Sequence, residues 1–307
     1  MSRTNGPVTA IGSELQSYYG RPIVKEPVWE PAVAVYFFTG GIAGSCSVLH
    51  GVGRLARNDG LAKTALYVGA AADLVSPALL VSDLGRPERF LNMLRVFKIT
   101  SPMSVGSWVL ALSSGSSVLA AALELAGRLR PVKWAAELVS FVTGPALATY
   151  TGALVANTTI PAWSEARDEL PLVFGASATA SGGAATTLFA PAGTAGPARR
   201  AALLGAVAEL ALTRRMENRL GFAGEVYRQG EAGRYGRLAK ACTAAGAALL
   251  ASRGRRSGLA ARAGAALVLA GGAALRFSVY RAGFQSARDP RYLVATQRER
   301  LQRATSR

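Results

Sequence analysis

The sequence predicts an all-α integral membrane protein, and three observations lead to that fold class. Half of the 307 residues are hydrophobic and only 17% are charged, whereas a soluble domain of this size usually carries more charge. The apolar residues are gathered into runs long enough to cross about 30 Å of hydrocarbon. Lysine and arginine give a net charge of +17 and cluster between those runs, which is typical of loops that face anionic lipid.

The composition argues against two other classes of protein. Aromatic residues make up only 7% of the chain and form no platform with the basic ones, so we expect membrane lipid, and no nucleic acid, as the partner of the positive charge. Cys46 and Cys242 both lie in apolar runs. They support neither a disulfide framework nor a metal centre, which needs about four thiolate or imidazole ligands.

The first half of the chain predicts four membrane spans. Residues 1–30 are polar and lack the apolar core of a signal peptide, so we expect the first span to direct insertion. The spans cover residues 31–53, 64–82, 103–123 and 134–155. Gly40 and Gly44 in the first span have the small-xxx-small spacing that lets another helix approach closely. Only Asp73 interrupts the second span.

A charged, amphipathic segment, residues 82–108, separates the second span from the third. Pro87 suits the first turn of a helix, and the apolar side chains after it recur at helical spacing, namely Phe90, Met93, Leu94 and Phe97. Residues 100–102 are expected to end this helix, and Ser104 to cap the next one. A short helix of this kind between two spans is expected to lie in the bilayer interface.

Hydropathy predicts the membrane spans less clearly in the second half of the chain. Residues 157–169 predict an acidic loop, and residues 171–190 predict a fifth span that is rich in small residues. Three further apolar stretches, residues 201–213, 238–252 and 259–280, are short or carry charge. They could span only if Arg or Lys side chains at their ends snorkel to the interface. The pattern alone therefore predicts five spans and leaves three more open.

If all eight stretches span, both termini share one side and the loops divide unequally. Four short loops on the other side hold 11 Lys or Arg against one acid, in residues 54–63, 128–133, 199–200 and 253–256. The positive-inside rule then predicts that this face is cytoplasmic. The larger face, with both termini, the interfacial helix and the loop at residues 214–240, is expected outside.

Five stretches resemble the membrane subunit of polysulphide-reductase-type complexes, the NrfD/PsrC family. They are the charged segment at 82–108, GPALATY at 144–150, ANTTIPAWSEARDELP at 156–171, AELALTRRMENRLG at 208–221 and SARDPRYLVATQRERL at 286–301. The resemblance implies eight transmembrane helices in two four-helix bundles, with a short interfacial helix between the second and third. The sequence departs from the family at Ser164, where histidine is expected, and at Ile99, where proline is expected.

This resemblance also implies a division of the chain. A polar N-terminal segment covers residues 1–30, the first bundle 31–156, the second bundle 157–284, and a basic tail 285–307. The first and fifth spans enter from the same face and are both rich in small residues, which agrees with a repeat of four helices. We expect the quinone site in the first bundle.

By resemblance, the chain is expected to be a multi-pass subunit of a complex in the bacterial cytoplasmic membrane. It would pass electrons between a four-cluster iron–sulfur subunit and menaquinone or another quinone, beside a molybdopterin catalytic subunit. His50 is the only histidine, and a bis-histidine haem needs two imidazoles, so we expect neither haem nor an iron–sulfur cluster of its own. Two alternatives stay open: a secondary transporter or proton pathway without quinone chemistry, and a membrane anchor without a ligand.

The candidate quinone-binding residues come mainly from the resemblance. In the family, a tyrosine of the fourth helix and residues near the start of the first helix contact the quinone, which points to Tyr150, Glu30 and Tyr36. Asp83 and Arg86 either line the mouth of the same pocket or close a salt bridge that holds the interfacial helix.

The acidic residues inside spans form a second group of candidates. Asp73 and Glu209 are costly in hydrocarbon and should face the interior of the protein or water. They either form a proton route that serves quinone chemistry or pair across helices, Glu209 for example with Arg214. For Glu137 and His50 we expect structural roles.

Overall fold

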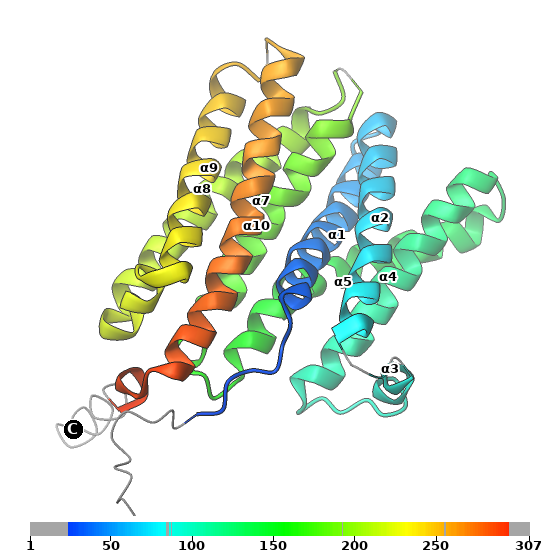
Figure 1. The fold of residues 1–307 in the computed structure, drawn as a ribbon. Helices are drawn as coiled ribbons and strands as arrows, with labels where there is room; N and C mark the ends of the chain where they lie inside the picture. The colour runs from blue at the N-terminus through cyan, green and yellow to red at the C-terminus, as the bar shows by residue number, and fades with distance from the viewer. Residues whose placement is uncertain (1–23, 84–85, 87, 192, 255, 295–307) are drawn as a thin grey trace, which may run out of the picture.

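The computed structural model describes residues 24–83, 86, 88–191, 193–254 and 256–294, and all regular elements in these ranges are helices (Figure 1). Eight helices are long: α1 (Pro31–Leu55), α2 (Asp59–Asp83), α4 (Pro102–Ala126), α5 (Arg130–Ala156), α7 (Leu170–Phe189), α8 (Gly196–Arg219), α9 (Gly230–Ser252) and α10 (Gly258–Arg288). Three are short: α3 (Arg89–Met93), α6 (Pro161–Ser164) and the 3₁₀ helix η1 (Gly221–Tyr227). The predicted all-α class is confirmed.

Five helices in the described part of the chain are long and apolar enough to cross a membrane, namely α1, α2, α4, α5 and α10. The first four coincide with the four spans predicted in the first half. The predicted fifth span became α7, which is not among the five because glycine, serine and threonine dilute its apolar residues. Conversely, α10 is one of the five candidate spans, although the sequence alone does not decide whether residues 259–280 cross the membrane.

α1 lies at the centre of the packing. It contacts α2, α5, α7 and α10, and 72% of its apolar window is buried, against 33% for α4. Gly44 explains one of these contacts, because a Cβ added there would lie 2.4 Å from the carbonyl oxygen of Gly144 in α5. The close approach predicted from Gly40 and Gly44 is therefore confirmed, with α5 as the partner.

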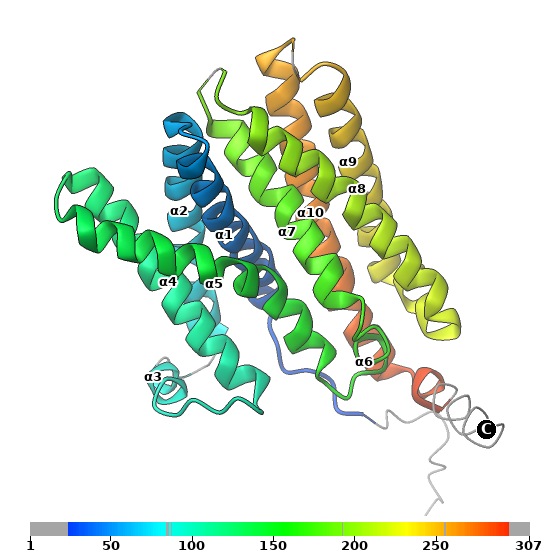
Figure 2. The same ribbon diagram turned by 180° about the vertical axis from the view of Figure 1, so that it is seen from behind.

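The remaining helices pack on both sides of α1. α4 lies against α5 and α2, while α7 and α9 flank α10, and α8 lies against α7 (Figures 1 and 2). The start of α1, the short helix α3 and the end of α10 lie at the lower end of Figure 1. The four short connections, from α1 to α2, α4 to α5, α7 to α8 and α9 to α10, lie at the upper end.

The helix predicted after Pro87 is shorter than expected. α3 ends at Met93, and Phe97 lies beyond it, edge-to-face with Trp108 at 6.3 Å between ring centroids. Ser101 caps α4 by accepting the Ser104 backbone N–H at 3.4 Å, so the prediction that Ser104 is the cap was wrong. The Ser104 hydroxyl instead contacts the backbone before it, at Val96 O and Lys98 N. These contacts hold the chain in a loop where the apolar spacing predicted helix.

The predicted loop at residues 214–240 is largely helical. α8 continues to Arg219, η1 follows, and α9 begins at Gly230. Ion pairs stabilise these charged helix ends, since Lys240 Nζ lies 2.6 Å from Glu217 Oε1 and Arg219 pairs with Glu169 at the start of α7. Hydropathy shows where an apolar stretch ends. It does not show that a helix continues into a polar stretch whose charged side chains form ion pairs.

Candidate functional site

Two tyrosines from different helices meet in the first half of the molecule. Tyr36 of α1 is 2% exposed and belongs to the same core cluster as Leu110 and Leu147, while the half-buried Tyr150 comes from α5. The Tyr150 ring lies on the backbone of α4, because a Cβ added at Gly106 would be 1.6 Å from Tyr150 Cζ. Only glycine at position 106 leaves the phenol this space.

The hydroxyl groups of these tyrosines are available to a ligand. Within the described ranges, neither Tyr36 nor Tyr150 donates a side-chain hydrogen bond, and the two side chains are close enough to interact electrostatically. A hydroxyl without a partner is costly in an apolar environment. A phenol O–H can donate a hydrogen bond to a carbonyl oxygen of a ligand.

The predicted residues Glu30 and Asp83 meet at one end of the molecule. The Glu30 backbone N–H, just before α1, donates to Asp83 Oδ1 at 2.9 Å, which ties the start of α1 to the end of α2. Tyr280 of α10 reaches the same place, where its hydroxyl donates to the Trp29 carbonyl at 2.6 Å. Tyr36 lies six residues along α1, about 9 Å deeper in the helix.

Arg86 does not join this group. It is exposed, and no ion pair connects it with Asp83 among the residues that the structure describes. The predicted salt bridge between Asp83 and Arg86 is therefore wrong. The Asp83 carboxylate instead accepts a backbone N–H at the positive end of α1, where the helix dipole favours an anion.

Asp73 lies in the middle of α2 and is 1% exposed. Ser114 of α4 donates to its Oδ1 at 2.7 Å, and Ser117 is a second neighbour, but Oδ2 has no hydrogen-bond partner. No cation pairs with Asp73 in the described part of the chain. One turn along α2, Ser76 Oγ lies 2.8 Å from Thr39 Oγ1 of α1, three residues beyond Tyr36.

Glu209 of α8 is buried in a different environment. Thr243 of α9 donates to its Oε1 at 2.9 Å, and the positive charge of Arg276 acts on it. Arg214, the partner that we had considered, is exposed and is not paired with Glu209 in the described residues. The pairing with Arg214 is therefore wrong. In the described residues Glu209 forms no direct ion pair, and the charge of Arg276 acts on it at longer range.

Sequence reasoning missed the role of Arg276. This side chain of α10 is 1% exposed and reaches between α1 and α7, where it donates to the carbonyls of Phe174 at 3.0 Å and Phe37 at 3.3 Å. Its guanidinium carbon lies 3.8 Å above the Phe174 ring. An arginine in the middle of an apolar run was the available signal, since such a residue seldom lies in a span without a partner.

The other end of the first half carries ion pairs. His50 Nε2 lies 3.3 Å from Glu137 Oε1, and His50 Nδ1 lies 2.8 Å from the Ala62 carbonyl oxygen. Arg54 and Lys133 also pair with Glu137, each at 3.7 Å. These contacts support the structural roles predicted for His50 and Glu137. Among the described residues, no three His, Cys, Asp or Glu side chains form a group that could hold a metal ion.

Comparison with known families gives one match. A family model described as polysulphide reductase, NrfD, matches residues 23–216, more than half of the chain. The match contains Tyr36, Asp73, Tyr150 and Glu209, and it ends before α9 and α10. The stretch at residues 286–301 that we likened to the family lies outside it. No curated protein matches the chain.

Proposed function

The chain belongs to the polysulphide reductase NrfD family, and on that premise we propose that it binds a quinone and exchanges electrons with an iron–sulfur partner. Family membership makes it a membrane subunit of a polysulphide reductase-like oxidoreductase complex. The proposal adds menaquinone or a related quinone as the lipid-soluble carrier. It also adds a four-cluster iron–sulfur subunit and a molybdopterin subunit as partners, in the bacterial cytoplasmic membrane.

The proximity of Tyr36 and Tyr150 is the observation that carries the proposal. Tyr36 and Tyr150 present two phenol hydroxyls that lack partners in the described structure, inside helices apolar enough to span the membrane. A bound quinone supplies the two-electron chemistry, and this chain orients its ring by donating to the carbonyl oxygens. Gly106 keeps the space in which Tyr150 lies. Glu30 and Asp83 lie at the start of α1, where they would face the mouth of the site.

We assign the hydroxyl-lined route from Asp73 to proton delivery. A quinone takes up two protons on reduction, and they must cross an apolar region to reach it. Asp73 has one free carboxyl oxygen, and Ser76 and Thr39 lie between it and Tyr36 along the two helices. These groups would pass a proton between water and the quinone oxygen that Tyr36 contacts.

The membrane layout that we propose has eight spans in two bundles of four. The eight long helices run between the two ends of the molecule, and each of α7, α8, α9 and α10 packs against another of these four (Figure 2). α8 and α9 carry polar residues, but Glu209 and Thr243 turn inward to each other. Because these side chains face the protein interior, they are not exposed to hydrocarbon. The free-energy cost of that exposure was the main argument against α8 and α9 as spans.

Substitution of Tyr150 tests the proposed function. In the complex purified in mild detergent, we expect Tyr150→Phe to lower kcat/KM for quinone roughly tenfold, about the value of one lost hydrogen bond in an apolar site. Tyr67→Phe in α2 is the matched control, because it removes the same atom from a residue of a separate core cluster. Equal activity of Tyr150→Phe and Tyr67→Phe would refute the quinone site.

A pair of glycine substitutions gives a second measurement at the same site. Alanine at Gly106 must displace the Tyr150 ring, whereas alanine at Gly115 of the same helix meets no atom within 4 Å. We expect Gly106→Ala to raise KM for quinone and Gly115→Ala to leave it unchanged. If the isolated chain in liposomes instead carried protons without quinone, and both glycine variants kept normal quinone kinetics, the alternative proton-pathway function would be favoured.

A further inference from the structure

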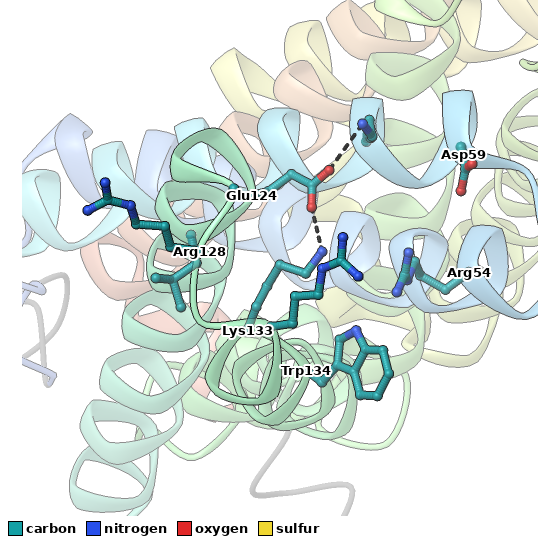
Figure 3. A pocket seen from close by; sticks show the side chains of 10 residues that line it. Arg54, Asp59, Glu124, Arg128, Lys133 and Trp134 are labelled. Carbon is teal, nitrogen blue, oxygen red and sulfur yellow. Dashed lines mark hydrogen bonds and ion pairs between the residues drawn. The ribbon is translucent and has the colours of Figure 1, made fainter.

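A polar cavity lies at the end of the molecule that carries the short connections. It has a volume of about 380 Å³ and is bounded by the ends of α1 and α4 and the beginnings of α2 and α5 (Figure 3). The lining side chains are Arg54, Asp59, Lys63, Leu123, Glu124, Arg128, Arg130, Lys133 and Trp134, with the backbone of Gly127. Two basic connections far apart in the sequence therefore meet around one cavity.

The charges around this cavity do not cancel. Five of the lining side chains are basic and two are acidic. Glu124 accepts from both Lys63, at 3.1 Å, and Lys133, and Figure 3 draws these two contacts as dashed lines. Arg128 and Arg130 are exposed and form no ion pair within the described ranges. Two guanidinium groups at the cavity are thus free to bind an anion.

The turn between α4 and α5 places these arginines. Gly127 and Leu129 both have left-handed backbone conformations, with φ of 64° and 51°, and Arg128 lies between them at the tip of the turn. Arg130 is the first residue of α5, so the positive end of the helix dipole lies at the same place. Guanidinium groups bind phosphate oxygens in pairs, which makes arginine the residue suited to this anion.

Exposed apolar side chains in this region favour a lipid over a free anion as the ligand. Trp134 lines the cavity and is 59% exposed. Leu125 and Leu129, which are next in sequence to the lining residues Glu124 and Arg130, are 76% and 63% exposed. Tryptophan at the end of a span is typical of the level of the lipid headgroups. A ligand with a phosphate group and acyl chains would contact both the arginines and these apolar side chains.

We propose that this cavity binds the phosphate headgroup of an anionic phospholipid, with Arg128 and Arg130 on the phosphate and Trp134 beside the first part of the acyl chains. Basic pockets between transmembrane helices are suited to such headgroups. The site is separate from the proposed quinone site, which lies toward the opposite end of α1, and does not depend on it.

Quenching of Trp134 fluorescence by brominated lipid tests the proposal. The full chain is placed in phosphatidylcholine vesicles that contain increasing fractions of phosphatidylglycerol brominated on its acyl chains. The signal of Trp134 is the difference between the unaltered chain and Trp134→Phe. We expect phosphatidylglycerol to quench this signal at a roughly 10- to 30-fold lower fraction than brominated phosphatidylcholine, since each nearby cation strengthens binding of an anionic lipid about fivefold.

The double variant Arg128→Gln/Arg130→Gln should lose this preference. The matched control is Arg253→Gln/Arg256→Gln, which removes two exposed charges from the connection between α9 and α10 at the same end of the molecule. Equal losses in the two double variants would show general attraction to the surface and overturn the proposal. Displacement of the brominated lipid by millimolar inorganic phosphate would also overturn it, in favour of a site for a free anion. Unchanged thermal melting of both variants verifies that they are folded.

Discussion

Asp73 and Glu209 are buried to a similar extent but differ in their surroundings. They are 1% and 2% exposed, each accepts a hydrogen bond from one hydroxyl group, and each has one oxygen without a hydrogen-bond partner. Glu209 lies under the charge of Arg276, which also joins α10 to α1 and α7. Asp73 faces only hydroxyl groups in the described part of the chain.

This difference separates a structural acid from one suited to proton transfer. A nearby cation stabilises a buried carboxylate, and removal of either charge leaves the other without compensation. A carboxyl group that faces hydroxyls can gain or lose a proton without leaving any cation exposed to hydrocarbon. The proton route proposed above therefore contains Asp73, and for Glu209 we propose a structural role under the longer-range charge of Arg276.

Removal of the buried arginine should have the largest effect. We expect Arg276→Met to lower the free energy of unfolding by about 3–5 kcal/mol, because Glu209 loses its compensating charge. Unfolding of the purified chain in detergent measures this loss. Arg262→Met, at an exposed arginine of the same helix, should cost less than about 0.5 kcal/mol.

A double variant decides whether the two charges are coupled. Glu209→Gln in the Arg276→Met background removes the uncompensated carboxylate and should recover more than half of the lost stability. If the double variant were no more stable than Arg276→Met, the contacts of Arg276 with Phe37 and Phe174 would account for its whole effect. The contrast between Glu209 and Asp73 would then fail.

Replacing Asp73 and Glu209 by their amides should affect quinone turnover to different extents. We expect Asp73→Asn to lower quinone turnover of the purified complex roughly tenfold, equal to about 1.4 kcal/mol on the barrier, because an amide cannot carry the proton. Glu209→Gln should change turnover less than about twofold. Steady-state quinone kinetics measure both, and the opposite order of effects would assign the proton route to the second half of the chain.

The smallest effect is expected from removing the hydroxyl groups that donate to Asp73 and Glu209. Ser114→Ala should destabilise the chain by about 1–2 kcal/mol, because Asp73 then loses the donor at Oδ1 while its Oδ2 already has none. Thr243→Val should cost less than about 1 kcal/mol, since Glu209 keeps the charge of Arg276. Thermal or denaturant unfolding compares the two. Equal losses of stability in the two variants would mean that the charge of Arg276 does not compensate Glu209 for the missing Thr243 hydroxyl.

The sequence predicted the elements of the first half better than those of the second. α1, α2, α4 and α5 coincide with predicted spans, because a helix in hydrocarbon must satisfy its own backbone and therefore needs an unbroken apolar run. In the second half, acids and arginines that turn inward lower the hydropathy of helices that are nonetheless long. Glu209 and Arg276 made their segments look unsuitable as spans, although each is buried.

Side-chain partners were predicted less well than helices. Arg214 was considered for Glu209, and Arg86 for Asp83, because both lie nearby in the sequence. In the structure, the Glu30 backbone N–H donates to Asp83, and the charge of Arg276 acts on Glu209 without a direct ion pair. Both come from helices or helix ends distant in the chain. The meeting of Tyr36 with Tyr150, expected only by resemblance, follows from the packing of α1 against α5 at Gly44 and Gly144.

The sequence by itself determined that this chain is an all-helical membrane protein of the NrfD family, with a polar first segment and basic short connections. These properties depend on runs of neighbouring residues, which hydropathy and local motifs record directly. Only the tertiary structure decided that the charge of Arg276 acts on Glu209, that Ser114 donates to Asp73, and that two basic connections enclose one cavity. Those contacts depend on which helices lie side by side, and that choice is made by the close packing of small residues between distant segments.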